Sequence, residues 1–278
     1  NGVWVASPLP SGSFTTIAYS TNNGQTWSLA SLPTSQTWAI PVYANGVWVV
    51  FPYTNASSTA AAYSLDGQTW LSAILPTDQI WRSPVYANGV WVGFPDNNTR
   101  AAYSTNGQTW ISSTLPYAYG GNPVYSGGTW VVIKDIAGTF SSSMYSTDGQ
   151  TWVSANLPAN QAWGYRATNS NGAWVMLPWS AGTAAAYSSN GQTWSAATLP
   201  TSQSWGGGVV YGGGTWVAFP GSNVTAAAYS TNGTTWSAAT LPAAQYWKTP
   251  TYTNGVWVAI PGNVSSSTAA YSSNGQTW

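Results

Sequence analysis

The chain contains no cysteine, no histidine and no glutamate among its 278 residues. The absence of cysteine excludes a disulfide framework and a thiolate metal site. The absence of histidine removes the commonest metal ligand and the commonest general base. We therefore expect no cofactor and no bound transition metal.

Charge is scarce as well: charged residues make up 4% of the chain, and the formal net charge is zero. Five basic residues leave no surface that could neutralise phosphates, which argues against nucleic acid as a partner. No apolar stretch approaches the roughly 20 residues needed to span a bilayer, so we expect no membrane insertion. Intracellular domains usually carry about 25% charged residues. The composition therefore favours an extracellular or cell-surface location, as for a secreted protein. Because the chain opens at Asn1 without a signal peptide, we expect a mature chain or an excised part of a longer one.

What the chain has in abundance is one repeated phrase, Tyr-Ser followed by an Asn/Asp-Gly turn and a tryptophan. Successive copies lie 43, 40, 42, 42, 42 and 42 residues apart, and they end at Trp27, Trp70, Trp110, Trp152, Trp194, Trp236 and Trp278. A second seven-fold phrase, Asn/Gly-Gly-X-Trp, lies between them and places Trp4, Trp48, Trp91, Trp130, Trp174, Trp216 and Trp257. A uniform period of this kind predicts an array of one structural unit, which we interpret as a single domain over residues 1–278.

Each unit predicts four short strands and no helix. In the unit from Trp205 to Pro242, the expected strands are residues 209–211, 215–220, 225–230 and 235–242. Asn-Gly and Asp-Gly pairs, as at Asn106-Gly107 and Asp148-Gly149, match the twist of a two-residue hairpin, so the third and fourth strands should form one. No window combines a sustained apolar period of 3.6 with helix caps.

The second strand of each unit is apolar on both faces, as in residues 47–51, Val-Trp-Val-Val-Phe. A sheet with one wet face would alternate apolar and polar residues. Narrow sheets buried on both sides and repeated about every 42 residues are what a β-propeller needs. The sequence thus predicts an all-β fold, a seven-bladed β-propeller of four-stranded antiparallel blades. A solenoid of stacked hairpins is the alternative.

The repeated phrase resembles the Asp-box, or BNR, repeat of sialidase-type β-propellers, whose pattern is Ser-X-Asp-X-Gly-X-Thr-Trp. Residues 20–27, Ser-Thr-Asn-Asn-Gly-Gln-Thr-Trp, match its full length; the other six copies are one residue shorter, and Asp occurs only at Asp66 and Asp148. The resemblance implies that the box is a folding element on the turn between the third and fourth strands, remote from any ligand site.

The first and last repeats are incomplete. The Leu-Pro segment and the strand that follows it occur six times, whereas the second and third strands occur seven times. The first repeat therefore lacks its first strand, and the last repeat lacks its fourth. Either a ring closes without these strands, or flanking sequence or another subunit supplies them.

The resemblance to sialidases raises the question of a glycosidase. Sialidases use an arginine cluster, a tyrosine activated by glutamate, and an acidic aspartate. This chain has Arg82, Arg100 and Arg166, no glutamate, and five aspartates that are not paired at any fixed spacing. Glycoside hydrolysis generally needs two carboxylates flanking one bond, so we expect that the protein is not an enzyme.

A third phrase, Gln-X-Trp, follows the Leu-Pro segment in five repeats. It places a side-chain amide and an indole on the same side of an extended segment, which suits a sugar that stacks on the ring and bonds the amide. Packing between blades is the alternative role. The residues are Gln36, Trp38, Gln79, Trp81, Gln161, Trp163, Gln203, Trp205, Gln245 and Trp247.

These observations predict a non-enzymatic extracellular β-propeller, a lectin-like adhesin with repeated weak carbohydrate sites. Its partners would be glycans or cell-surface polysaccharide. The alternative is a structural subunit of an extracellular filament or surface layer, since sparse charge favours self-association. Trp179 falls outside the repeat pattern, in a loop between the second and third strands of its unit. Asn-X-Ser/Thr sequons begin at Asn55, Asn97, Asn223, Asn232 and Asn263.

Overall fold

The computed structural model describes residues 2–8, 12–53, 57–119, 121, 123–133, 138–164, 167–262 and 267–278. These residues form β-strands and no helix, in seven antiparallel sheets of three or four strands that we number by chain order. The all-β prediction is confirmed. Within the described ranges there is accordingly no helix of the length and hydrophobicity that a bilayer span requires.

The chain divides into two compact units. Unit 1 comprises Asn1–Pro123 and Ser146–Val153, and unit 2 comprises Val124–Tyr145 and Ser154–Trp278. The assignment of residues 1–278 to one domain stays a prediction, as does closure of the seven sheets into a ring.

Unit 1 contains the first three sheets. The first has three strands, β1 (Trp4–Ala6), β2 (Phe14–Ser20) and β3 (Ser28–Gln36). The second has four, β4 (Val42–Ala44), β5 (Val47–Val50), β6 (Ser58–Ser64) and β7 (Leu71–Gln79). The third has β8 (Val85–Ala87), β9 (Val90–Gly93), β10 (Asn98–Ser104) and β11 (Ile111–Tyr119).

Unit 2 contains the other four sheets, except that the turn Ser146–Val153 groups with unit 1. The fourth sheet has β12 (Val124–Ser126), β13 (Thr129–Val132), β14 (Phe140–Ser146) and β15 (Val153–Gln161). The fifth has β16 (Thr168–Ser170), β17 (Ala173–Met176), β18 (Gly182–Ser188) and β19 (Ser195–Gln203). The sixth has β20 (Val209–Gly212), β21 (Thr215–Ala218), β22 (Val224–Ser230) and β23 (Ser237–Gln245). The seventh has β24 (Thr251–Thr253), β25 (Val256–Ala259) and β26 (Ala270–Ser272).

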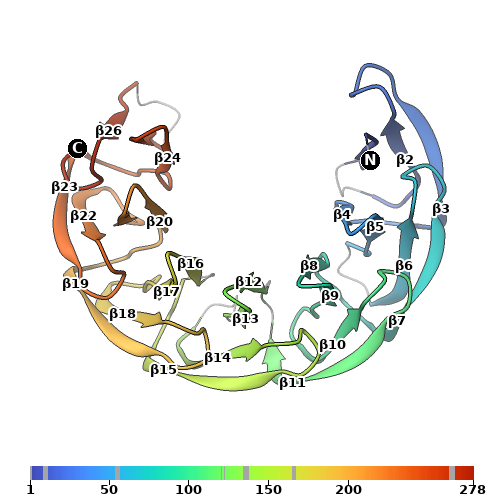
Figure 1. Cartoon of the computed structure of the whole chain (residues 1–278), viewed down its shortest axis with the longest axis horizontal. Helices are drawn as coiled ribbons and strands as arrows, with labels where there is room; N and C mark the ends of the chain where they lie inside the picture. The colour runs from blue at the N-terminus through green and yellow to red at the C-terminus, as the bar shows by residue number, and fades with distance from the viewer. Residues whose placement is uncertain are drawn as a thin grey trace. The chain divides into compact units, whose positions relative to one another are not determined.

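Strands follow one another across each sheet in chain order. In unit 2 the long strands β19 and β23 lie at one edge and the short strands β16, β20 and β24 at the opposite edge (Figure 1). The three-stranded sheets are the first and the last, so the predicted incomplete repeats are confirmed among the described residues.

The two kinds of hairpin differ. Between β4 and β5, Asn45 and Gly46 both have positive φ, 49° and 80°, which is the two-residue turn that an Asn-Gly pair favours. Between β10 and β11 the chain needs residues 105–110, and of the pair Asn106-Gly107 only the glycine has positive φ. The predicted two-residue turn is therefore wrong for the repeated Tyr-Ser…Gly…Trp phrase. The serine and asparagine side chains close a longer loop instead. We call the turn, glycine and tryptophan of this phrase the box turn, box glycine and box tryptophan.

Neighbouring sheets pack through one recurrent contact. A Cβ added to the box glycine Gly107 would lie 2.9 Å from Val49 of the preceding sheet and 3.2 Å from the indole nitrogen of Trp91 in its own sheet. Phe51, just after β5, meets the box tryptophan Trp110 of the next sheet edge-on, with ring centroids 4.8 Å apart.

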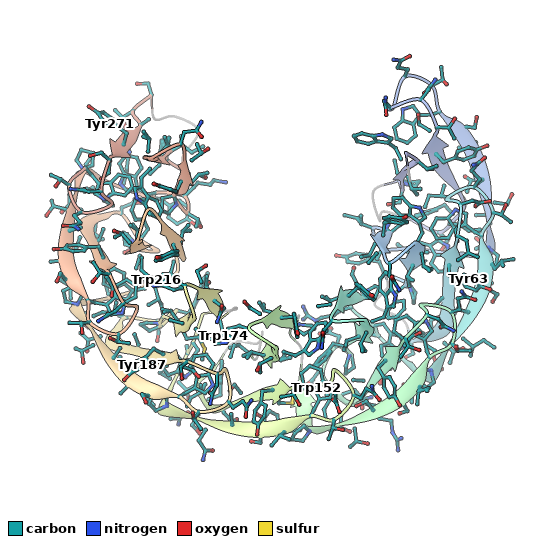
Figure 2. The ribbon with its side chains drawn as sticks, in the orientation of Figure 1. Tyr63, Trp152, Trp174, Tyr187, Trp216 and Tyr271 are labelled. Atoms are coloured by element: carbon teal, nitrogen blue, oxygen red, sulfur yellow. The ribbon has the colours of Figure 1, made fainter. Side chains whose placement is uncertain are left out.

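In unit 2, Gly233 makes the same contact with Val175 and Trp216. Trp174 and Trp216 are at most 1% exposed and lie among the side chains of their sheets (Figure 2). The second-strand and box tryptophans are therefore mostly packing residues, and only a tryptophan outside this scheme is a candidate for binding.

Candidate functional site

The box turns are closed by one aspartate or asparagine side chain. In the second sheet, the Ser64 hydroxyl donates to Asp66 Oδ1 at 2.9 Å, and the Gly67 N–H donates to Ser64 Oγ at 2.8 Å. The N–H groups of Gln68 and Thr69 both donate to Asp66 Oδ1 at 2.7 Å. These four hydrogen bonds all lie within the turn, so Ser64 Oγ and Asp66 Oδ1 serve to close it.

Asparagine reproduces this arrangement. Asn106 Oδ1 accepts from the N–H groups of Gln108 and Thr109 at 2.9 and 3.0 Å, and the Ser104 hydroxyl donates to it at 3.0 Å. Aspartate differs in its charge, and asparagine adds one donor, since Asn106 Nδ2 donates to Thr109 Oγ1 at 2.9 Å. The hydrogen bond from the Thr69 N–H, with those from the Gln68 N–H and the Ser64 hydroxyl, stabilises the carboxylate and lowers the pKa of Asp66 to about 2. Burial acts in the opposite direction but is outweighed. At Asp148 burial raises the pKa, but the corresponding hydrogen bonds outweigh it and the net pKa is lowered.

The five tryptophans of the Gln-X-Trp phrase lie in the interior. Trp38, Trp81, Trp163, Trp205 and Trp247 are between 0% and 3% exposed. Four of the indole N–H groups donate to the backbone carbonyl four residues earlier, at 3.1 to 3.3 Å. For the indole N–H of Trp205, the described part of the chain supplies no acceptor.

The glutamines of the phrase end the last strand of five sheets and bond to the sheet that follows. The side-chain amides of Gln79, Gln161 and Gln203 donate to the carbonyls of Arg100, Ala184 and Ala226, at 2.6 to 2.9 Å. Gln36 and Gln245 bond to the hydroxyls of Ser58 and Thr268.

This placement corrects the sugar-site hypothesis for the phrase. An indole that is at most 3% exposed presents no face on which a sugar ring can stack. Its amide partner is already committed to the neighbouring sheet. The Gln-X-Trp residues therefore pack between sheets, which is the alternative role that the sequence left open.

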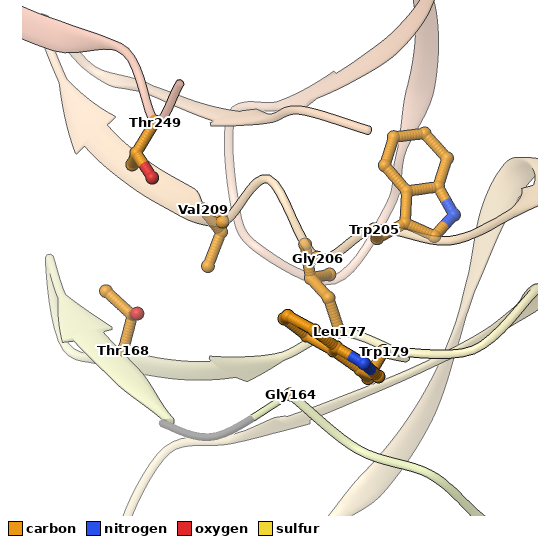
Figure 3. Close-up of a pocket in the computed structure, with 9 residues that line it drawn as sticks. Gly164, Thr168, Leu177, Trp179, Trp205, Gly206, Val209 and Thr249 are labelled. Carbon is orange, nitrogen blue, oxygen red and sulfur yellow. The ribbon is translucent and has the colours of Figure 1, made fainter. Parts of the chain in front are cut away.

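Unit 2 contains a cavity of about 310 Å³ between the fifth and sixth sheets. That volume lies at the lower end of the range for small-molecule pockets. Its lining residues come from five segments of the chain: Gly164, Thr168, Leu177, Trp179, Trp205, Gly206, Gly208, Val209 and Thr249. The indole of Trp179 lies beside Leu177 and Gly206, while Thr168, Val209 and Thr249 lie on the other side of the cavity (Figure 3).

Trp179 is held in place by its backbone. Its N–H donates to the carbonyl of Ala162 at 2.8 Å, and its carbonyl accepts from the Ser204 hydroxyl at 2.6 Å. The indole is nevertheless 43% exposed. The other exposed tryptophans, Trp4 and Trp27, belong to the first sheet, so Trp179 is the exposed indole of unit 2.

Glycine makes room for this indole. A Cβ on Gly206 would approach two ring carbons of Trp179 to 2.9 Å, closer than real side chains tolerate. Gly208 has φ of +92°, a conformation that other residues rarely adopt, and a Cβ there would lie 3.0 Å from Thr249 Oγ1. A larger residue at either position would displace a wall of the pocket.

The sequence contains a signal for this pocket in the length of the connection from the Gln-X-Trp tryptophan to the first strand of the next sheet. In the second sheet, Tyr43 is the fifth residue after Trp38, whereas in the sixth sheet Tyr211 is the sixth residue after Trp205. The fifth sheet has the same extra residue between Trp163 and Asn169. These two longer connections, the run Gly206-Gly207-Gly208 and the unmatched Trp179 together mark the pocket.

The lining of the pocket is uncharged. It combines one indole, the apolar side chains of Leu177 and Val209, and the hydroxyls of Thr168 and Thr249. The Thr249 hydroxyl donates to the Gly207 carbonyl at 2.8 Å and can still accept a hydrogen bond. Such a lining fits a neutral ligand with both an apolar face and hydroxyl groups.

No group of three metal-binding side chains occurs in the described ranges. Asp96 pairs with Arg82 at 3.1 Å. Of the other residues singled out in the sequence, Arg166, Asn55 and Asn263 lie outside the described residues. Asn97 and Asn223 are exposed, whereas Asn232 closes a box turn.

No protein-family model matches the chain, and no curated protein matches it in sequence. Several solved structures match it in fold. YCF48 bound to a D1 peptide is 13% identical, over 94% of this chain and 92% of its own, with a TM-score of 0.50. A catalytically inactive virginiamycin B lyase from Staphylococcus aureus with quinupristin is 12% identical over 89% and 85%, with a TM-score of 0.54. BamB from Moraxella catarrhalis is 9% identical over 89% and 74%, with a TM-score of 0.53.

These neighbours are β-propellers, so the chain has a fold of the β-propeller kind. At such low identity the likeness extends to the fold alone. It also corrects the expectation that the protein is not an enzyme. Because the matched structures include a lyase beside proteins of other kinds, this fold does not exclude catalysis.

Proposed function

We propose that the protein binds carbohydrate, and that the pocket around Trp179 is its site. The observation that carries the proposal is an exposed indole held in an uncharged cavity of about 310 Å³ beside two threonine hydroxyls. The C–H face of a sugar stacks on an aromatic ring, and its hydroxyls bond to polar groups around the rim. The partner would be a neutral glycan or a cell-surface polysaccharide, with the protein in an extracellular or cell-surface location.

This proposal replaces the five predicted sugar sites with a single site. The five Gln-X-Trp indoles are buried, whereas Trp179 is exposed and has no equivalent tryptophan in the other repeats. Only the fifth and sixth sheets have an extra residue between the Gln-X-Trp tryptophan and the position equivalent to Tyr43 in the strand that follows it. Trp205 of that phrase still contributes to the pocket wall, on the far side of Gly206 from Thr168 and Thr249 (Figure 3). Since no charged residue lines the pocket, binding should depend little on salt.

The experiment is a neutral-glycan array followed by calorimetry on the best ligand, with Trp179→Ala and Trp179→Phe. We expect Trp179→Ala to weaken binding at least tenfold, about 1.4 kcal/mol, and Trp179→Phe to retain most of the affinity, since a stacking face remains. Tyr53→Ala is the matched control, because Tyr53 is an aromatic residue that is 56% exposed and lies outside the pocket.

All variants are first checked for folding by circular dichroism. Equal binding by Trp179→Ala and the wild type would place the glycan site elsewhere. If no glycan is retained, or if only peptides are retained, carbohydrate is the wrong ligand class.

A further inference from the structure

The first and last sheets expose faces that are buried in the interior sheets. On the last sheet, Val256 and Val258 are 40% and 41% exposed, and Ile260 is 57% exposed. The equivalent residues of the second sheet, Val47, Val49 and Phe51, are at most 7% exposed. The difference arises because the third sheet covers Val47, Val49 and Phe51, whereas no sheet of the described residues covers Val256, Val258 and Ile260.

The first sheet exposes the opposite face. Its second-phrase tryptophan Trp4 is 55% exposed and its box tryptophan Trp27 is 46% exposed. The corresponding pair in the third sheet, Trp91 and Trp110, is at most 8% exposed. Those two indoles are covered by the valines and the phenylalanine of the preceding sheet.

The two exposed faces are the two halves of one interface. In the interior, a valine packs on the next box glycine, beside the second-strand tryptophan, as Val217 does on Gly275 beside Trp257. The residue after the strand packs on the next box tryptophan, as Phe219 does on Trp278, with centroids 5.0 Å apart. The last sheet has the donor half of this contact and the first sheet has the receiving half.

We propose that the last sheet of one molecule packs on the first sheet of a second copy. In this interface Val256 and Val258 lie against Trp4 and Gly24, and Ile260 lies against Trp27. The formal net charge of zero means that no net repulsion opposes the contact. The first box is one residue longer than the others, so the receiving face differs locally from the interior ones. A head-to-tail contact of this kind is heterologous and extends into linear or ring-shaped oligomers.

The exposed tyrosine of the last sheet supports the same face. Tyr271, in β26, is 75% exposed and lies at the margin of unit 2 (Figure 2). Its counterparts Tyr63, Tyr187 and Tyr229 are only partly exposed and pack beside or within the interior sheets. A second copy would cover Tyr271 as well.

The test is sedimentation velocity on the intact chain and two variants, Val258→Lys and Trp27→Lys, each confirmed as folded. The wild type should form oligomers as its concentration rises, and each variant alone should weaken association at least tenfold. An equimolar mixture of the variants should form a 1:1 dimer and stop there, because each retains the half that the other lacks. Ile74→Lys is the matched control: Ile74 is 73% exposed, on β7, and away from both faces.

Formation of the mixed dimer supports the head-to-tail interface. A wild type that stays monomeric at all concentrations would overturn it and would favour closure within one chain. Equal loss of association in Ile74→Lys would show that the contacts are non-specific, and this also overturns the proposal. The pocket residue Trp179 takes no part in the interface, so glycan binding and self-association are tested separately.

Discussion

At the residue scale, the role of each tryptophan follows from its surroundings and not from its neighbours in sequence. Trp81 and Trp179 both follow a Leu-Pro segment closely, yet Trp81 is 3% exposed and Trp179 is 43% exposed. Trp81 packs edge-on against Phe51 with its centroid 5.9 Å away, whereas Trp179 lies over a glycine. The same side chain is thus buried between sheets at position 81 and exposed beside a cavity at position 179.

Stability should separate these two tryptophans. Trp81→Ala leaves a cavity in a packed interface and should lower the free energy of unfolding by about 3–5 kcal/mol. Trp179→Ala removes a side chain that is nearly half exposed, and we expect a loss below about 1 kcal/mol. Urea unfolding midpoints of the two variants provide the measurement. Similar losses in both would mean that Trp179 belongs to the core.

The box aspartate Asp66 should make stability depend on acid pH. Its pKa is about 2 in the folded chain against 3.8 ordinarily, so its stabilising effect is present above pH 3.8 and is lost as the pH falls through 2. We expect Asp66→Asn to be close to neutral at pH 7, because asparagine makes the same bonds at Asn106.

The free energy of unfolding of the wild type should fall relative to that of Asp66→Asn between pH 4 and pH 2, because only the wild type carries the titrating carboxylate. Asp66→Ala, which loses the acceptor at every pH, should cost about 1 kcal/mol, since the turn is exposed. Thermal unfolding across this pH range is the measurement. A wild type that gains stability relative to Asp66→Asn on acidification would contradict the assigned role.

At the scale of the element, the repeated phrases predicted the strands well, because the sequence pattern of each strand occurs six or seven times in the chain. The expected third strand, residues 225–230, matches β22 (Val224–Ser230), and the incomplete ends were predicted by counting. The fourth strand runs further than expected, to Gln245 in β23, through a register shift between Val224 and Ala226 of its partner strand. Proline cannot donate to the ladder, so the Leu-Pro segment is accommodated in the irregularity.

The pocket could not be predicted from these patterns. It depends on the absence of a side chain at Gly206 and on a loop residue, Trp179, that approaches from another sheet. Burial of the Gln-X-Trp indoles could not be predicted from the sequence either, because sequence spacing gives the direction of a side chain but not what covers it.

One glycine tests the construction of the pocket. Gly206→Ala should push the Trp179 indole out of position and weaken glycan binding at least fivefold, since its Cβ would lie 2.9 Å from the ring. Gly12→Ala, in open space, is the matched control. Calorimetry with the ligand chosen on the array measures both. Unchanged binding in Gly206→Ala would show that the position of the indole does not determine affinity.

At the scale of the whole molecule, the chain is an array in which each sheet depends on its neighbours. Stability in such arrays is a sum of the intrinsic stability of each repeat and of nearest-neighbour interfaces. The second sheet in unit 1 and the fifth and sixth sheets in unit 2 pack on both of their neighbours, whereas the first and last sheets each pack on one. The end sheets are also short of a strand each. They should therefore be the least protected parts of the fold.

Hydrogen exchange at two protein concentrations tests this dependence and the proposed contact together. At low concentration the amides of β25, in the last sheet, should exchange faster than those of β21, because Val256 and Val258 have no covering sheet. At high concentration a second copy should protect β25 and β1 and leave β21 unchanged, because β21 is already covered on both faces. Val258→Lys should abolish the concentration dependence at β25 without changing exchange in β21. Equal protection of β25 and β21 in the dilute wild type would instead mean that the last sheet is already covered within a single molecule, as ring closure predicts.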